Sequence, residues 1–148
     1  MTRLRSEVLA ASSGALLLAL GIGVGALGAH VLKVRLGPEH FATLQTAVHY
    51  QQIDALGLLA LGAWLRAGVA ARTRRGEAGS DTTGDAALRL PVWLVIIGTV
   101  LFSGSLYGLL AGAPRFTGVL TPLGGSSLIL GWALAARAFW RGRNVPGS

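Results

Sequence analysis

Residues 46–65, TAVHYQQIDALGLLALGAWL, decide how the chain folds. Their second half is too apolar for the surface of a soluble protein, whereas the first half carries several polar groups. The stretch reads as a helix, and a bilayer core about 30 Å thick needs about 20 helical residues to cross it. If this helix spans a membrane, Asp54 lies near mid-depth, where an ionisable group is costly and is usually functional or paired.

Three other segments have the length and composition of membrane spans. They carry no charged side chain, and they cover residues 8–29, 90–114 and 118–136. With the first stretch they predict an all-α polytopic membrane protein, a single domain in which four transmembrane helices form a small bundle. The spans are expected at about residues 8–29, 46–65, 91–112 and 118–138.

The segments between the spans predict the orientation. Pro38 suits a first helical turn, so a short interfacial helix extension is expected before the second span. Residues 66–90 hold five arginines and predict a loop. Four spans place this loop and both termini on one side, which leaves three of the 13 Lys and Arg residues opposite: Lys33, Arg35 and Arg115. The positive-inside rule therefore predicts cytoplasmic termini.

Composition narrows the class of protein further. Of the 148 residues, 52% are apolar and 13% are charged, and the mean hydropathy is +0.59. A soluble domain has about 25% charged residues. The net charge of +7 could indicate nucleic acid, but the basic side chains flank apolar runs and would meet anionic lipid, so no nucleic-acid partner is expected. The absence of cysteine excludes disulfides and thiol catalysis.

Glycines recur inside the spans at spacings that favour helix packing. A pair of small residues four positions apart lets a second helix approach closely. The glycines expected to pack against neighbouring helices are Gly21, Gly25, Gly104, Gly108, Gly112, Gly124 and Gly131.

Polar side chains inside the spans form a candidate intramembrane site around Asp54. Its members are His30, His49, Tyr50, Gln51, Asp54, Ser103, Ser105 and Tyr107. Two interpretations are open at this point. Asp54 could make one interhelical hydrogen bond, as polar groups in helix bundles often do. Alternatively, it could carry protons or cations together with His30, His49 and Tyr50.

A helical wheel separates the polar side chains of the second span into two groups. Gln45, His49 and Gln52 fall on one face, and Tyr50 and Asp54 fall on the other side. The histidines lack the i, i+4 spacing of a helical metal site, and no serine lies in a nucleophile elbow. The sequence therefore predicts no cofactor, no metal site and no enzymatic activity.

Five short motifs occur in order along the chain. They are GALGAH at 25–30 with LK at 32–33, TAVHYQ at 46–51, LFSGSLY at 101–107, TPLGG at 121–125 and GW at 131–132. The ordered set resembles domain of unknown function 423, or uncharacterised protein family 0382, which is related to transmembrane protein 256. The resemblance implies a multi-pass bacterial inner-membrane protein and implies no activity. The family usually has histidine at the position of Asp54, which argues against metal ligation there but leaves a hydrogen-bonding or proton site open.

The recurrent motifs are packing motifs rather than nucleophiles. They favour a non-enzymatic structural or assembly protein whose partners are the lipid bilayer and either a homo-oligomer or another membrane protein. The alternative is a subunit of a small-solute or proton-linked transporter or channel that uses Asp54. Four short helices leave little room for a pore, which lowers the weight of that alternative.

Overall fold

Four long helices make up the fold. The computed structural model describes residues 6–76 and 83–142, and these residues contain no β-strand. The elements are α1 (Ser6–Leu27), a π-helical turn (Gly28–Leu32), α2 (Lys33–Arg35), α3 (Pro38–Arg74), α4 (Thr83–Leu110), a 3-10 turn (Arg115–Val119) and α5 (Leu120–Gly142). Four segments are long and apolar enough to cross a membrane: Ser6–Arg35, Pro38–Arg74, Ala86–Leu110 and Phe116–Arg141.

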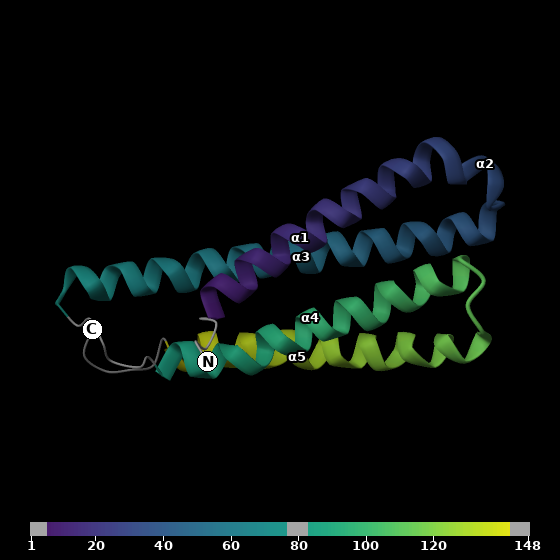
Figure 1. Ribbon diagram of the computed structural model, residues 1–148. Coiled ribbons are helices and arrows are strands. Elements are labelled where there is room, and N and C mark those ends of the chain that lie inside the picture. Colours follow the sequence, from purple (N-terminus) through teal and green to yellow (C-terminus); the bar gives the residue numbers. More distant parts are fainter. Residues whose placement is uncertain (1–5, 77–82, 143–148) are drawn as a thin grey trace, which may run out of the picture.

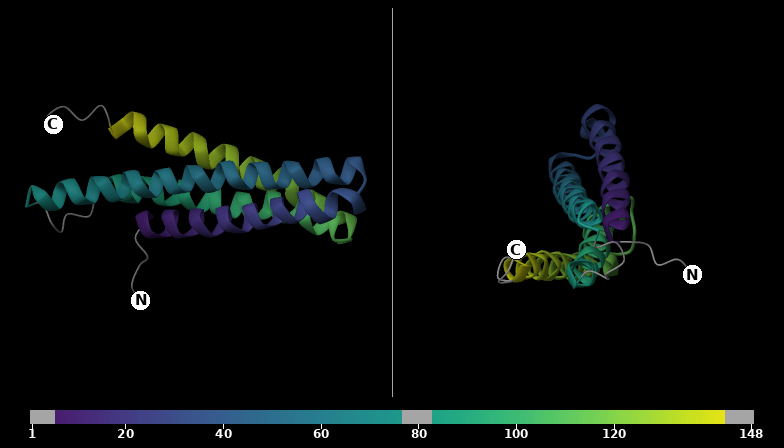
Figure 2. Two further views of the ribbon diagram at one scale, coloured as in Figure 1. Left: turned by 90° about the horizontal axis from the view of Figure 1, so that it is seen from above. Right: turned by 90° about the vertical axis from the view of Figure 1, so that its left-hand side faces the viewer.

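The helices pack as two antiparallel pairs. α1 lies against α3 and α4 lies against α5, and the two pairs meet mainly where α3 contacts α4 (Figure 1). Seen end-on, the helices follow a bent line, with α1 and α3 in one arm and α4 and α5 in the other (Figure 2). The start of α1, the end of α3, the start of α4 and the end of α5 all lie at one end of the molecule, as the sequence predicts for four spans.

The surface of these helices is apolar. Large hydrophobic side chains point outward on each long helix, including Leu16 at 62% exposure, Val100 at 55% and Ile129 at 75%. The buried core is smaller and contains Leu58, Val92 and Val95. A continuous apolar surface of this kind would be a liability in water, and it suits lipid as the solvent.

The segment at residues 66–90, predicted to be a cytoplasmic loop, is helical at both ends. α3 continues as far as Arg74, and α4 already begins at Thr83. Alanine and arginine dominate the end of α3 and are strong helix formers, so the helix continues beyond the bilayer core. Pro91, where the third span is expected to begin, lies inside α4. The middle of the predicted loop, residues 77–82, lies outside the described residues.

Glycines hold α1 and α3 together, as predicted for Gly21 and Gly25. A Cβ atom added at Gly21 would lie 3.2 Å from the Gln52 side chain, and one at Gly25 would lie 3.3 Å from Val48 Cγ1. Two of the predicted glycines act in the same way between α4 and α5. Gly124 faces the backbone of Phe102, and a Cβ at Gly131 would lie 2.9 Å from a methyl group of Val95.

The predicted packing face at Gly104, Gly108 and Gly112 is wrong within this chain. An added Cβ at Gly104 or Gly112 would meet no atom within 4 Å in the described part of the chain. Gly108 has only Ala113 nearby, from the turn that follows α4. The reason is that α4 packs on α5 through Gly98, where an added Cβ would lie 2.9 Å from Leu128. Gly112 has a φ of 87° and ends the helix, because only glycine adopts that backbone conformation readily.

Candidate functional site

Asp54 lies at the junction of three helices. It belongs to α3, and its side chain is 3% exposed. The indole Nε1–H of Trp132 in α5 donates to Asp54 Oδ1 at 2.9 Å, and the hydroxyl group of Thr99 in α4 lies 3.2 Å from Asp54 Oδ2. Both carboxyl oxygens therefore have partners from other helices, which is what a polar group in a membrane interior requires.

The sequence around Asp54 makes room for this arrangement. Gly57 follows three positions later, so it lies on the same face of α3 one turn away. A side chain at Gly57 would collide with the six-membered ring of Trp132. The missing Cβ thus lets the indole lie against α3 while its N–H reaches the carboxyl group.

Thr99 has one hydroxyl proton for two possible acceptors. Its oxygen lies 2.8 Å from the carbonyl oxygen of Val95, one turn back in α4, and 3.2 Å from Asp54 Oδ2. One proton cannot make two full hydrogen bonds. A side chain at position 54 that itself donates a hydrogen to Thr99 would allow both contacts to form.

Gln51 joins a second set of three helices. It lies one turn before Asp54 in α3 and is 4% exposed. Its amide Nε2–H donates to the carbonyl oxygen of Leu17 in α1 at 2.8 Å, and its Oε1 accepts from the hydroxyl group of Tyr107 in α4 at 2.8 Å. The amide nitrogen and the amide oxygen of Gln51 therefore each have a hydrogen-bond partner, and this one side chain connects both arms of the fold.

Serine hydroxyl groups make further contacts between helices. Ser103 donates to the carbonyl oxygen of Ala47 in α3 at 2.9 Å, and Ser105 lies 2.7 Å from the hydroxyl oxygen of Thr121 in α5. Gln51, Asp54, Ser103, Ser105 and Tyr107 from the predicted site therefore all hydrogen-bond across helix boundaries. We call this set, with Thr99 and Trp132, the interhelical polar cluster.

The remaining predicted site residues lie elsewhere. Tyr50 is 46% exposed and packs its ring against Phe102, with centroids 5.1 Å apart. His49 contacts the Tyr50 ring edge-on at 5.9 Å, and His30 lies exposed in the π-helical turn. None of these three side chains hydrogen-bonds to Asp54. A relay through Asp54, His30 and Tyr50 is therefore not assembled in this structure.

Sequence reasoning missed Thr99 and Trp132. The sequence contains only part of the information needed to identify them. Tryptophan near the middle of a span carries an N–H group that must find an acceptor, and Asp54 is an acceptor at comparable depth. The pairing across 78 positions could not be read from spacing along one helix.

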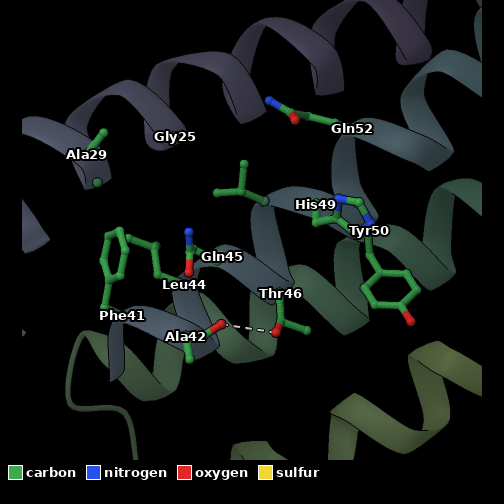
Figure 3. A pocket seen from close by; sticks show the side chains of 12 residues that line it. Gly25, Ala29, Phe41, Ala42, Leu44, Gln45, Thr46, His49, Tyr50 and Gln52 are labelled. Carbon is green, nitrogen blue, oxygen red and sulfur yellow. Dashed lines mark hydrogen bonds between the residues drawn. The ribbon is translucent and has the colours of Figure 1, made fainter. Parts of the chain in front are cut away.

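An open groove lies beside the polar cluster. It has a volume of about 620 Å³ and runs between the end of α1 and the first half of α3 (Figure 3). Its apolar wall includes Gly25, Gly28 and Leu44, and its polar side chains are those of one face of α3: Gln45, His49 and Gln52, with Thr46 and Tyr50 beside them. The predicted common face of Gln45, His49 and Gln52 is confirmed. In the described ranges, no three His, Asp or Glu side chains converge as a metal site.

The fold and the buried cluster define a small polytopic α-helical membrane protein. The family described as "Protein of unknown function (DUF423)" matches residues 24–125. The chain belongs to this family.

Bacterial relatives extend the match beyond the family segment. A UPF0382 membrane protein of Staphylococcus haemolyticus is 35% identical over 121 residues, which cover 82% of this chain and 86% of the relative. The UPF0382 membrane protein YwdK of Bacillus subtilis is 36% identical over 121 residues, covering 82% and 87%. The UPF0382 inner membrane protein YgdD of Escherichia coli is 35% identical over 133 residues, covering 86% and 82%. No solved structure is significantly similar to the chain.

Proposed function

We propose that this protein is a non-enzymatic structural or assembly component of the bacterial inner membrane. The observation that carries the proposal is the use of its buried polar groups. Asp54, Gln51 and Ser103 direct their side-chain hydrogen bonds to neighbouring helices rather than into a cavity. Such bonds stabilise one arrangement of helices, which a protein needs when its lipid-facing surface is to be recognised by a partner.

The transport alternative receives less support. A side chain that accepts and releases protons or cations needs a path to both aqueous sides, and such groups usually face a water-filled cavity. Asp54 is 3% exposed, both of its oxygens have protein partners, and it is not among the residues that line the groove.

The proposed location is the inner membrane with both termini in the cytoplasm. The Escherichia coli relative is named an inner membrane protein, and ten of the 13 Lys and Arg residues fall on the side of the termini when four spans are counted. The partner is proposed to be either a second copy of this chain or another membrane protein that contacts the apolar outer faces.

Cysteine crosslinking in native membranes tests the proposal. The chain contains no cysteine, so single-cysteine variants at outward positions on three helices are clean probes: Leu20→Cys, Gly104→Cys and Ile129→Cys. We expect one position to give a discrete product of constant mass with a homobifunctional crosslinker, while the other two stay monomeric. Equal, weak and heterogeneous products from all three positions would contradict a defined partner.

A further inference from the structure

The groove between α1 and α3 contains a row of polar side chains that make no hydrogen bonds within the described part of the chain. Gln45, His49 and Gln52 lie at i, i+4 and i+7 on one face of α3. None of the three side chains makes a hydrogen bond to another residue in the described part of the chain. This contrasts with the interhelical polar cluster on the other faces of α3, where each inner polar side chain has a partner.

Two members of the row fall within the expected second span. Counted at 1.5 Å per residue from residue 46, where the sequence predicts that this span begins, His49 lies roughly 4 Å and Gln52 roughly 9 Å along the helix axis into the span. Gln45 lies just before it. An unsatisfied polar group in the hydrocarbon region costs several kcal/mol, so His49 and Gln52 would each gain from a hydrogen-bonding partner there.

The backbone of α1 creates the space beside this row. α1 lies close to α3 at Gly14, where an added Cβ would be 2.7 Å from the carbonyl oxygen of Ala55. Toward its end α1 diverges from α3 (Figure 1), and the chain continues into a π-helical turn at Gly28–Leu32. π-Helical turns are rare and are frequently found at functional sites. The resulting hollow of about 620 Å³ is within the range of pockets for small organic ligands.

The lining of the groove indicates the chemistry of its occupant. No Lys, Arg, Asp or Glu side chain lines it, so it offers nothing to neutralise an ionic ligand. The Lys33 amine is not part of the lining but lies over the ring of Phe41, which is, at 6.0 Å from the ring centroid. Gln45, His49 and Gln52 each offer N–H donors, and Phe41, Leu44 and Val48 offer an apolar wall (Figure 3).

We propose that the α1–α3 groove binds a membrane-dissolved amphiphile with an uncharged head that carries hydrogen-bonding oxygens, the chemistry that quinones provide. Side chains at i, i+4 and i, i+3 are neighbours about 5–6 Å apart, so two oxygens on opposite sides of a ring can meet two donors of the row at once. This site is separate from the proposed assembly role and does not depend on it.

The test is a titration of the full-length protein in phosphatidylcholine nanodiscs with two probes. Decylubiquinone carries the head oxygens, and decylbenzene has the same tail without them. The chain contains three histidines, so ¹⁵N-histidine labelling gives three backbone amide resonances, and His49→Leu assigns one of them. We expect decylubiquinone to shift the His49 resonance saturably and decylbenzene to leave it unchanged.

Matched variants locate the site. Gln45→Leu removes one donor of the row and should weaken decylubiquinone binding about tenfold, the effect of one lost hydrogen bond. Ala29→Phe should weaken binding as much by filling the groove without touching the row. His40→Leu, on the same helix but outside the groove, should bind like the wild type. Circular dichroism and the melting temperature show that each variant is folded.

Three outcomes would overturn the proposal. The first is no saturable shift with decylubiquinone. The second is equal binding of decylbenzene, because the groove would then accept only acyl chains. The third is a high yield of disulfide-linked dimer from His49→Cys together with no quinone binding, because a second copy of the chain would then cover the row.

Discussion

Asp54 is a structural acceptor in this account, and its isosteric amide should replace it. In Asp54→Asn, the Oδ1 atom can still accept from Trp132, and the new Nδ2–H can donate to Thr99, whose own proton then goes to Val95. We predict a change in the free energy of unfolding of less than about 1 kcal/mol, and a loss of about 1–3 kcal/mol for Asp54→Leu, which leaves the Trp132 N–H without an acceptor while Thr99 keeps its bond to Val95. Both changes in the free energy of unfolding can be measured by unfolding the variants in mixed micelles with increasing amounts of denaturing detergent. Equal destabilisation by asparagine and leucine would contradict the assignment.

Gly57 should be intolerant of even one added carbon atom. Gly57→Ala would make a methyl group collide with the six-membered ring of Trp132 and force the indole away from Asp54. Overpacking of this kind costs about 1–3 kcal/mol. Gly68→Ala is the matched control, because Gly68 lies on the same helix with no atom within 4 Å of an added Cβ in the described structure. The control should keep or slightly raise the melting temperature, and a similar loss in both variants would argue against a specific contact.

At the scale of the helices, the α4–α5 contact depends on Gly124 and not on Gly104. An alanine at Gly124 would collide with the backbone of Phe102, which cannot move independently, whereas Gly104 faces open space. We predict that Gly124→Ala lowers stability by at least about 2 kcal/mol and that Gly104→Ala is close to neutral in detergent. Thermal unfolding of the two purified variants checks this. A more severe effect at Gly104 would restore the packing face that the sequence suggests.

The elements differ in how well the sequence predicts them. Runs without charge identify three of the four spans, because lipid penalises charged side chains inside them, and the second span, which carries Asp54, is recognised by its apolar second half. The sequence did not predict where α3 ends or where α4 begins. Arginine and alanine can continue a helix outside the bilayer as readily as they can form a loop. The stripe from Gly104 to Gly112 shows that spacing reveals a smooth face but not which face meets a neighbour. Gln51 and Asp54 were found as candidates, while their partners Leu17 and Trp132 depend on how the pairs of helices meet.

At the scale of the whole molecule, the topology has two sides that differ in charge. Val34 is 89% exposed in the connection between α1 and α3, and Arg75 is exposed at the opposite end, just after α3. With cytoplasmic termini, Val34→Cys should react with a membrane-impermeant maleimide in intact spheroplasts, and Arg75→Cys should react only after permeabilisation. The reverse pattern would place the termini outside.

The whole fold rests on two arms that are joined by hydrogen bonds as well as by packing. Gln51 spans α1, α3 and α4, and Asp54 spans α3, α4 and α5. Because α1 and α5 stand at the far ends of the bent line of helices, removal of either connection should loosen one arm relative to the other (Figure 2).

A double-mutant cycle between Asp54 and Trp132 tests the central claim most directly. The free energy of unfolding in mixed micelles would be measured for the wild type, Asp54→Leu, Trp132→Phe and the double variant. If the buried polar groups serve to join helices, the double variant should be less destabilised than the sum of the single variants by about 0.6–1.7 kcal/mol, the range for interhelical hydrogen bonds in membranes. Strict additivity would show that these two side chains do not stabilise the fold through each other, and it would contradict the account.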